Sequence, residues 1–188
     1  MLRLFYPGAY VTSVFCIDYQ ALWDRGCRGL LFDIDNTLVP HGDDSTPEIN
    51  ALFRRLHAMG FRTLMLSNNG EARIRRFLQD IDARFLSNAG KPRPKGYRRA
   101  VEMLGLSKDE VLVIGDQVFT DVLGANLAGL GSILVRFIGW ETETDLGKRR
   151  RLEQVILRRY EKKYPAGRLG RVWIEENNHA MEQEQALL

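Results

Sequence analysis

Short apolar runs alternate along the chain with segments in which apolar residues recur at helical spacing. The runs predict strands near residues 29–33, 61–66, 84–86, 111–115 and 132–136. The intervening segments predict helices near residues 18–25, 46–59, 70–80, 95–104 and 120–128. This alternation predicts an α/β fold, with a central parallel sheet of about five strands covered by helices on both faces.

The first of these strands ends in two carboxylates. Asp33 and Asp35 follow the apolar run Leu30–Leu31–Phe32, and side chains two positions apart on a strand point to the same face. Two neighbouring carboxylates repel each other, and a divalent cation that prefers oxygen ligands would compensate them. The alternative is an Asx turn at the end of a strand, which suits the same residue types.

Two further polar segments follow later elements. Ser67–Gly70 comes after the strand near 61–66, where small polar side chains and backbone N–H groups can hold a phosphate or form an ordinary turn. Gly90–Gly96 contains Lys91 in a loop that Pro92 and Pro94 stiffen, and a rigidly held lysine can neutralise an anion. Read by itself, this segment is also typical of a solvated basic loop.

The strand near 111–115 ends in a third acidic motif. Gly115 permits a tight turn before Asp116, and Asp121 lies where the next helix should begin, so a helix-capping role is the alternative for Asp121. Ligands of open parallel sheets bind outside the carboxyl ends of the strands. We therefore expect the four polar segments to lie together at one edge of the sheet.

The order of these motifs over residues 28–136 resembles the haloacid dehalogenase-like (HAD) phosphatase superfamily. The resemblance implies that Asp33 is the nucleophile and that Asp35 is the general acid and base. This role requires a pKa nearer neutrality than that of a free aspartate, an upward shift that close carboxylates can produce. Thr37 would support the loop. Ser67, Asn68 and Lys91 would bind the phosphoryl group, Lys91 also neutralising the nucleophile, and Lys95 is a second candidate for that lysine.

The same resemblance implies a magnesium cofactor. Mg²⁺ would be held by Asp33, by the backbone carbonyl of Asp35 and by Asp116, while Asp121 would act on the waters of the metal. The connections from Asp33 to Ser67 and from Ser67 to Lys91 each have room for only one helix and one strand, so we expect no cap domain. The site would be open, with loop 40–45 and its His41 as the only flap.

A narrower resemblance covers residues 1–140. The motifs DIDNTLVP, LSNN, GKPRPKGYRRA and GDQVFTD are similar to those of the YqeG-type branch of subclass IIIA, which is related to mitochondrial phosphatidylglycerophosphate phosphatases. This implies a phosphorylated substrate, in particular the anionic phospholipid phosphatidylglycerophosphate, which would be converted to phosphatidylglycerol.

Four segments are expected along the chain. Residues 1–27 form an arm that packs on the core or offers an interfacial aromatic surface, and residues 28–147 form the catalytic core. Residues 148–165 form a basic amphipathic helix, with eight basic and two acidic side chains over 148–163, suited to a membrane surface, to a polyanion or to solvent. Residues 166–188 form a tail expected to be partly disordered.

Composition is that of an ordinary globular domain. The chain has 188 residues, a formal net charge of +3 and two cysteines, Cys16 and Cys27, without metal-ligand spacing. No apolar run is long enough for a membrane span, and the N-terminus does not resemble a signal peptide. We expect a cytoplasmic protein that associates peripherally with the inner face of the membrane.

Two other functions stay open on the sequence. One is a capless phosphatase of soluble or macromolecular phosphomonoesters. The other is a non-catalytic module that binds RNA or ribosome-assembly partners, with a binding constant that falls steeply with salt. Nucleic acid binding is disfavoured, because every matched catalytic position retains a competent residue.

Overall fold

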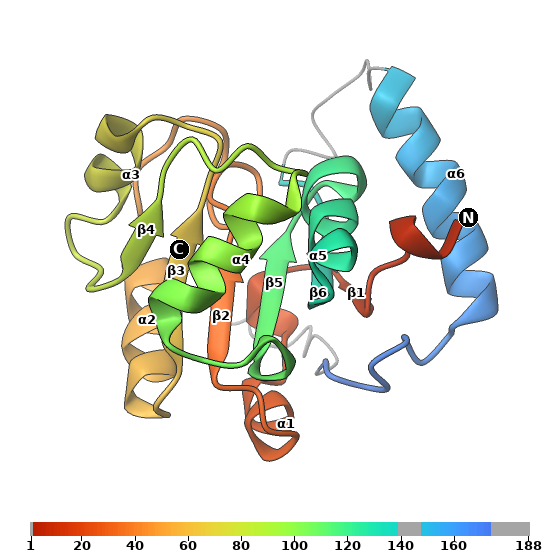
Figure 1. Ribbon diagram of the computed structural model, residues 1–188, viewed down its shortest axis with the longest axis horizontal. Helices are drawn as coiled ribbons and strands as arrows, with labels where there is room; N and C mark the ends of the chain where they lie inside the picture. The colour runs from red at the N-terminus through yellow and green to blue at the C-terminus, as the bar shows by residue number, and fades with distance from the viewer. Residues whose placement is uncertain (1, 139–147, 174–188) are drawn as a thin grey trace, which may run out of the picture.

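The computed structural model describes residues 2–138 and 148–173 and has an α/β fold around one parallel sheet (Figure 1). Six strands lie in the order β1-β6-β5-β2-β3-β4. Their bounds are Ala9–Val11 (β1), Gly29–Phe32 (β2), Arg62–Leu66 (β3), Arg84–Leu86 (β4), Val111–Gly115 (β5) and Gly131–Val135 (β6). The expected fold class is confirmed, and the expected number of about five strands is corrected to six.

The additional strand lies in the N-terminal arm. Ala9–Val11 pairs in parallel with β6 at the edge of the sheet, with Ala9 opposite Ile133 and Val11 opposite Val135. Only three residues pair, and Tyr10 between the two buried positions is half-buried, so the run is too short for a clear strand pattern. The arm therefore extends the sheet as well as packing on the core.

Helices and short helical turns connect the strands. The α-helices are Tyr19–Asp24 (α1), Pro47–Ala58 (α2), Glu71–Phe77 (α3), Pro94–Leu104 (α4), Leu123–Ala128 (α5) and Lys148–Lys163 (α6). The 3₁₀ turns are Leu2–Phe5 (η1), Val14–Cys16 (η2) and Lys108–Glu110 (η3), and Val118–Val122 (η4) is a π-helical turn. Thr46 caps α2 through its side chain, with Pro47 in the first turn.

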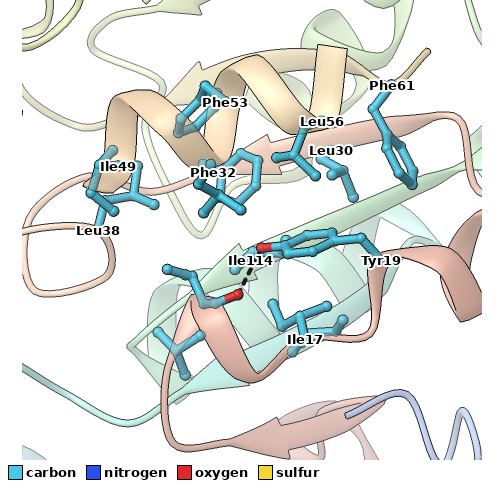
Figure 2. Packing of buried hydrophobic residues seen from close by; sticks show 14 of the residues in the cluster. Ile17, Tyr19, Leu30, Phe32, Leu38, Ile49, Phe53, Leu56, Phe61 and Ile114 are labelled. Atoms are coloured by element: carbon cyan, nitrogen blue, oxygen red, sulfur yellow. Dashed lines mark hydrogen bonds between the residues drawn. The ribbon is translucent and has the colours of Figure 1, made fainter. Parts of the chain in front are cut away.

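The central strand β2 is buried on both faces, as expected for a parallel sheet covered by helices. Leu30 and Phe32 pack on one face with Phe53 and Leu56 of α2, and Figure 2 shows these side chains together with Tyr19 of α1. Leu31 packs in the second cluster on the other face, against residues of α4 and α5. Because these side chains alternate between the two buried faces, the register of β2 is fixed, and with it the position of Asp33 directly after the strand.

Helix α6 packs beside the N-terminal segment (Figure 1). Ile156, Leu157 and Tyr160 are buried in a third apolar cluster with Tyr6 and Leu134, among others. Two other apolar residues of α6 remain exposed, Leu152 at 52% and Val155 at 43%. The apolar residues of this helix thus divide between the core and the surface.

The segment after α6 returns to the N-terminal arm. The Arg168 N–H donates to Gly8 O at 2.6 Å, and the Asp18 N–H donates to Val172 O at 3.0 Å. Val172 is fully buried. Residues 166–173 are therefore packed on the domain, whereas the remainder of the expected tail lies outside the described residues.

Candidate active site

A buried lysine joins two of the acidic motifs. Lys91 Nζ lies 2.6 Å from Asp33 Oδ1 and 2.7 Å from Asp121 Oδ1, and the lysine side chain is only 4% exposed. Asp33 continues the pairing of β2 with β5, because its N–H donates to Ile114 O at 2.9 Å. The structure thus brings together three of the residues that the sequence predicts for the site.

Asn68 fixes the backbone on which this lysine is carried. The Lys91 N–H donates to Asn68 Oδ1 at 2.8 Å, and Asn68 Nδ2 donates to Lys91 O at 3.2 Å. The neighbouring Ser67 is buried, and its Oγ accepts a hydrogen bond from the Asn69 N–H at 3.1 Å. Lys95 is exposed in the first turn of α4 and does not line the cavity that holds Lys91.

Asp121 lies inside the π-helical turn η4 rather than at a helix cap. Its Oδ2 accepts a hydrogen bond from the Gln117 N–H at 3.1 Å, while Oδ1 faces Lys91. A Cβ atom on Gly115 would lie 2.3 Å from Asp121 Cγ, so only glycine lets the strand end pass this close to the carboxylate. The spacing of glycine and the two aspartates therefore has a steric basis.

Asp116 is held by a residue that the sequence analysis did not place in the site. Arg150 of α6 is ion-paired through Nη2 with Asp116 Oδ2, and its Nη1 donates to Asp116 O at 2.9 Å. The same Nη1 lies 2.9 Å from Oε2 of Glu153, a buried carboxylate that also accepts from the Phe119 N–H at 3.3 Å. Thr37 Oγ1 donates to Asp116 Oδ1 at 3.3 Å, as expected for a residue that supports the loop.

Three buried carboxylates converge at this edge of the sheet. One oxygen from each of Asp33, Asp116 and Asp121 lies within 4.8 Å of the others. Lys91 is shared by Asp33 and Asp121, and Arg150 is shared by Asp116 and Glu153, so acidic side chains outnumber the basic ones paired with them. Carboxylate oxygens are the ligands that Mg²⁺ prefers, so the donor set and its residual charge fit a divalent cation.

Burial and mutual repulsion affect the protonation of this group. Burial, with repulsion from Asp121, raises the pKa of Asp33 to about 6 against the attraction of Lys91. Burial and the charge of Asp121 likewise raise the pKa of Asp116 to about 7. Burial would lower the pKa of Lys91, but the carboxylates of Asp121 and Asp33 outweigh it and raise that pKa.

Asp35 differs from the expectation based on neighbouring carboxylates. Burial alone would raise its pKa, but the Gly42 N–H at 2.9 Å and the Arg73 guanidinium at 2.9 Å hold the pKa below its usual value. Asn69 Nδ2 also donates to this carboxylate. The expected upward pKa shift is therefore wrong for the protein as it stands, because Asp35 faces donors rather than the other carboxylates.

A cavity of about 250 Å³ opens over these groups. Its walls include Asp33, Asp35, Ser67 and Lys91 from the expected motifs, together with Arg149 of α6. His41 of the flap loop also lines the cavity; its side chain is exposed, and its Nδ1 lies 3.9 Å from Asp35 Oδ1. Within the described residues, no cap domain is inserted between β2 and β4.

The residues of this site that the sequence analysis missed include Arg73, Arg149, Arg150 and Glu153. Arg149 and Arg150 belong to a run of basic residues, and such a run is also typical of a surface that binds anionic partners. Nothing local in that run distinguishes Arg150, because its partner Asp116 lies 34 positions earlier in the chain.

Comparison with known proteins agrees with this geometry. A sequence model of haloacid dehalogenase-like hydrolases matches residues 41–129. The chain is 37% identical over 134 residues to "Probable phosphatase YqeG" of Bacillus subtilis, covering 71% of this chain and 78% of that protein.

A second relative is a lipid phosphatase. The chain is 27% identical over 169 residues to "Phosphatidylglycerophosphate phosphatase 1, chloroplastic/mitochondrial" of Arabidopsis thaliana, over 84% of this chain. The chain spans about half of that plant protein, at 48% of its length. Among solved structures, NagD from Escherichia coli K-12 superimposes with a TM-score of 0.51 at 12% identity, over 65% of this chain and 94% of NagD, which shows a shared fold.

Proposed function

Because the chain belongs to the haloacid dehalogenase-like hydrolases, in their YqeG-type branch, we propose that it is a Mg²⁺-dependent phosphatase of phosphatidylglycerophosphate. The reaction proceeds through an aspartyl-phosphate and leaves phosphatidylglycerol and inorganic phosphate. The observation that carries the proposal is the buried Lys91, which lies between Asp33 and Asp121 at the base of an open cavity.

Asp33 is the nucleophile of this proposal. Its carboxylate oxygen attacks phosphorus, and the bond between phosphorus and the glycerol oxygen breaks. Lys91 keeps the carboxylate ionised and offsets the charge that spreads over the phosphoryl oxygens, while Ser67 and backbone N–H groups of its loop orient those oxygens. Asn68 acts on the reaction through its two hydrogen bonds to the Lys91 backbone.

Asp35 transfers the protons. It protonates the departing glycerol oxygen, and it then takes a proton from the water that attacks the aspartyl-phosphate. Its pKa is low in the free protein, so it must gain its proton when the substrate binds. The negative charge of a bound phosphoryl group favours that protonation, because a neighbouring anion raises the pKa of a carboxyl group.

The carboxylates of Asp33 and Asp116, with the backbone carbonyl of Asp35, would hold Mg²⁺, and Asp121 would lie beside it. When bound, the cation supplies positive charge to the phosphoryl oxygens in the transition state. Two cations hold these carboxylates close together in the folded protein. Arg150 is ion-paired with Asp116, and Lys91 is ion-paired with Asp33 and Asp121.

A lipid substrate agrees with the open cavity and with the surface of α6. Leu152 and Val155 are exposed on this helix among basic residues, a combination that favours an anionic membrane surface. No helix in the described part of the chain is long and apolar enough to cross a membrane. We therefore propose peripheral contact with the membrane through the exposed side of α6.

The test is phosphate release from phosphatidylglycerophosphate in mixed micelles, with and without Mg²⁺. Asp33→Asn protein is the control, because asparagine keeps the shape of the side chain and cannot act as the carboxylate nucleophile. Mg²⁺-dependent turnover that the variant lacks supports the proposal. Turnover of soluble phosphomonoesters alone would contradict the lipid substrate and favour a soluble or macromolecular phosphomonoester.

A further inference from the structure

Arg149, in the first turn of α6, lines the catalytic cavity, but the proposed chemistry does not use it. The aspartates and the lysine that line the same cavity are already ion-paired, Asp33 with Lys91 at 2.6 Å and Asp35 with Arg73 at 2.9 Å. Among the described residues, no carboxylate is ion-paired with Arg149. This side chain therefore brings to the cavity a positive charge that the described part of the protein does not neutralise.

Two contacts keep Arg149 beside the cavity. Its guanidinium lies over the ring of Phe119 in η4, 5.5 Å from the ring centroid, and Phe119 packs edge-on against Phe5 at 5.4 Å. The next residue, Arg150, connects the same turn of α6 to Asp116. Consecutive side chains of a helix point about 100° apart, so Arg149 borders the cavity while Arg150 is directed to the acidic group. An arginine held in this way loses less freedom when it binds an anion.

The two cations of this cavity lie at different depths. Lys91 is only 4% exposed and lies against the nucleophile Asp33, whereas Arg149 is an exposed residue. Both line one cavity of about 250 Å³, so a single small ligand can contact both. A ligand whose terminal phosphate lies at Asp33 and Lys91 therefore brings the next part of its structure to Arg149.

We propose that Arg149 is a specificity-determining residue that binds a second phosphate, carried by the leaving alcohol of the substrate. The substrate class is a phosphomonoester with a phosphodiester one glycerol away from the phosphate that is released. The planar guanidinium can donate two parallel hydrogen bonds to the oxygens of such a group. This inference rests on the proposed function, because it places Arg149 relative to a phosphate bound at Asp33, and phosphatidylglycerophosphate is a member of the class.

The test measures binding of two soluble compounds. Glycerophosphoglycerophosphate is the deacylated form of phosphatidylglycerophosphate and retains both phosphates, whereas glycerol 3-phosphate lacks the phosphodiester. Both are titrated calorimetrically, with Mg²⁺ present, into the full-length Asp33→Asn protein, which lacks the nucleophile. We expect the compound with two phosphates to bind more tightly. Adding Arg149→Gln should raise its dissociation constant about tenfold, within the range for loss of a hydrogen bond to a charged group, and should reduce the preference between the compounds.

Arg159→Gln in the same background is the matched control, since this exposed arginine of α6 is not among the described residues that line the catalytic cavity. Arg149→Lys should retain part of the preference, because lysine keeps the charge and loses the paired geometry of the guanidinium. Equal binding of the two compounds, or equal effects of Arg149→Gln and Arg159→Gln, would overturn the role of Arg149.

Phosphate release from the lipid separates this inference from the proposed function. Binding that depends on Arg149, in a protein that releases no phosphate from phosphatidylglycerophosphate, supports the role of Arg149 and overturns the proposed lipid substrate. Turnover of that lipid without Arg149-dependent binding of glycerophosphoglycerophosphate overturns the role of Arg149 alone.

Discussion

The guanidinium of Arg150 on α6 is ion-paired with the buried carboxylate of Asp116 at the end of β5. It also donates to the backbone oxygen of Asp116 at 2.9 Å and to Glu153 at 2.9 Å. Helix α6 follows the last strand of the sheet and carries none of the expected catalytic motifs. This single side chain nevertheless connects the helix to the acidic group, so α6 is part of the candidate site.

Replacing Arg150 with methionine should destabilise the metal-free protein. The change leaves Asp116 and Glu153 buried without their shared cation, and loss of one member of a buried ion pair costs about 3 kcal/mol. We expect this decrease in the free energy of unfolding, measured by urea denaturation with EDTA present. Mg²⁺ should raise the melting temperature of the variant more than that of the parent, because it supplies the missing positive charge.

Arg159→Met is the control for this experiment, as an exposed arginine of the same helix. Its unfolding free energy should stay within about 0.5 kcal/mol of the parent value. Equal stability of the Arg150 and Arg159 variants would show that the ion pair with Asp116 does not support the fold.

Asp33→Asn should abolish phosphate release while the protein remains folded. The amide cannot form the aspartyl-phosphate, so we expect a loss of at least about 10³-fold, as for other nucleophile substitutions. Lys91 retains its ion pair with Asp121, which preserves the packing around it. Phosphate release and the melting temperature should be measured on the same preparation, and appreciable retained activity would contradict the nucleophile assignment.

The sequence predicts those parts of the site that lie at strand ends. Asp33, Ser67 and Asp116 directly follow apolar runs, and in a parallel sheet such positions converge whatever the packing in between. The fold class follows from the same regularity of alternating elements, whereas the family was inferred from the resemblance of the motifs. The sixth strand could not be predicted in this way, since Ala9–Val11 is recognisable only through its pairing with β6.

The partners of individual side chains could not be predicted from the sequence. Asp35 was expected to respond to a neighbouring carboxylate, but the flap loop and α3 bring Gly42 and Arg73 against it and reverse the pKa shift. Arg150 is chemically the same as the basic residues beside it, and only the docking of α6 directs it to Asp116. Such contacts depend on tertiary packing and leave no local pattern in the sequence.

The metal-free protein should lose stability as the pH rises through the raised pKa values of Asp33 and Asp116. The pKa values of Asp33 and Asp116 are raised to about 6 and about 7, so between the ordinary aspartate value and these values the folded state binds more protons than the unfolded state. Stability then falls with rising pH. To isolate this effect, unfolding free energies of the parent and of Asp116→Asn should be compared from about pH 5 to about pH 8 in EDTA.

Asparagine does not titrate, so the variant should gain stability relative to the parent as pH rises. Parallel curves for the two proteins would show that the pKa of Asp116 is close to its unfolded value. Excess Mg²⁺ should reduce the pH dependence of the parent, because cation binding favours the ionised carboxylates.

Substitution of the exposed apolar residues of α6 should weaken membrane binding. Leu152→Gln with Val155→Gln removes two side chains that are 52% and 43% exposed. We expect cosedimentation with vesicles containing phosphatidylglycerol to fall about tenfold or more, since each buried CH₂ contributes about 0.8 kcal/mol.

Arg149 and Arg150 are unsuitable for this test, because one lines the catalytic cavity and the other holds Asp116. Leu127→Gln on α5, 43% exposed, is the control for loss of a surface apolar group. Equal binding by the double variant and the control would exclude the exposed side of α6 as the membrane contact, whereas loss in the double variant alone would assign the contact to it.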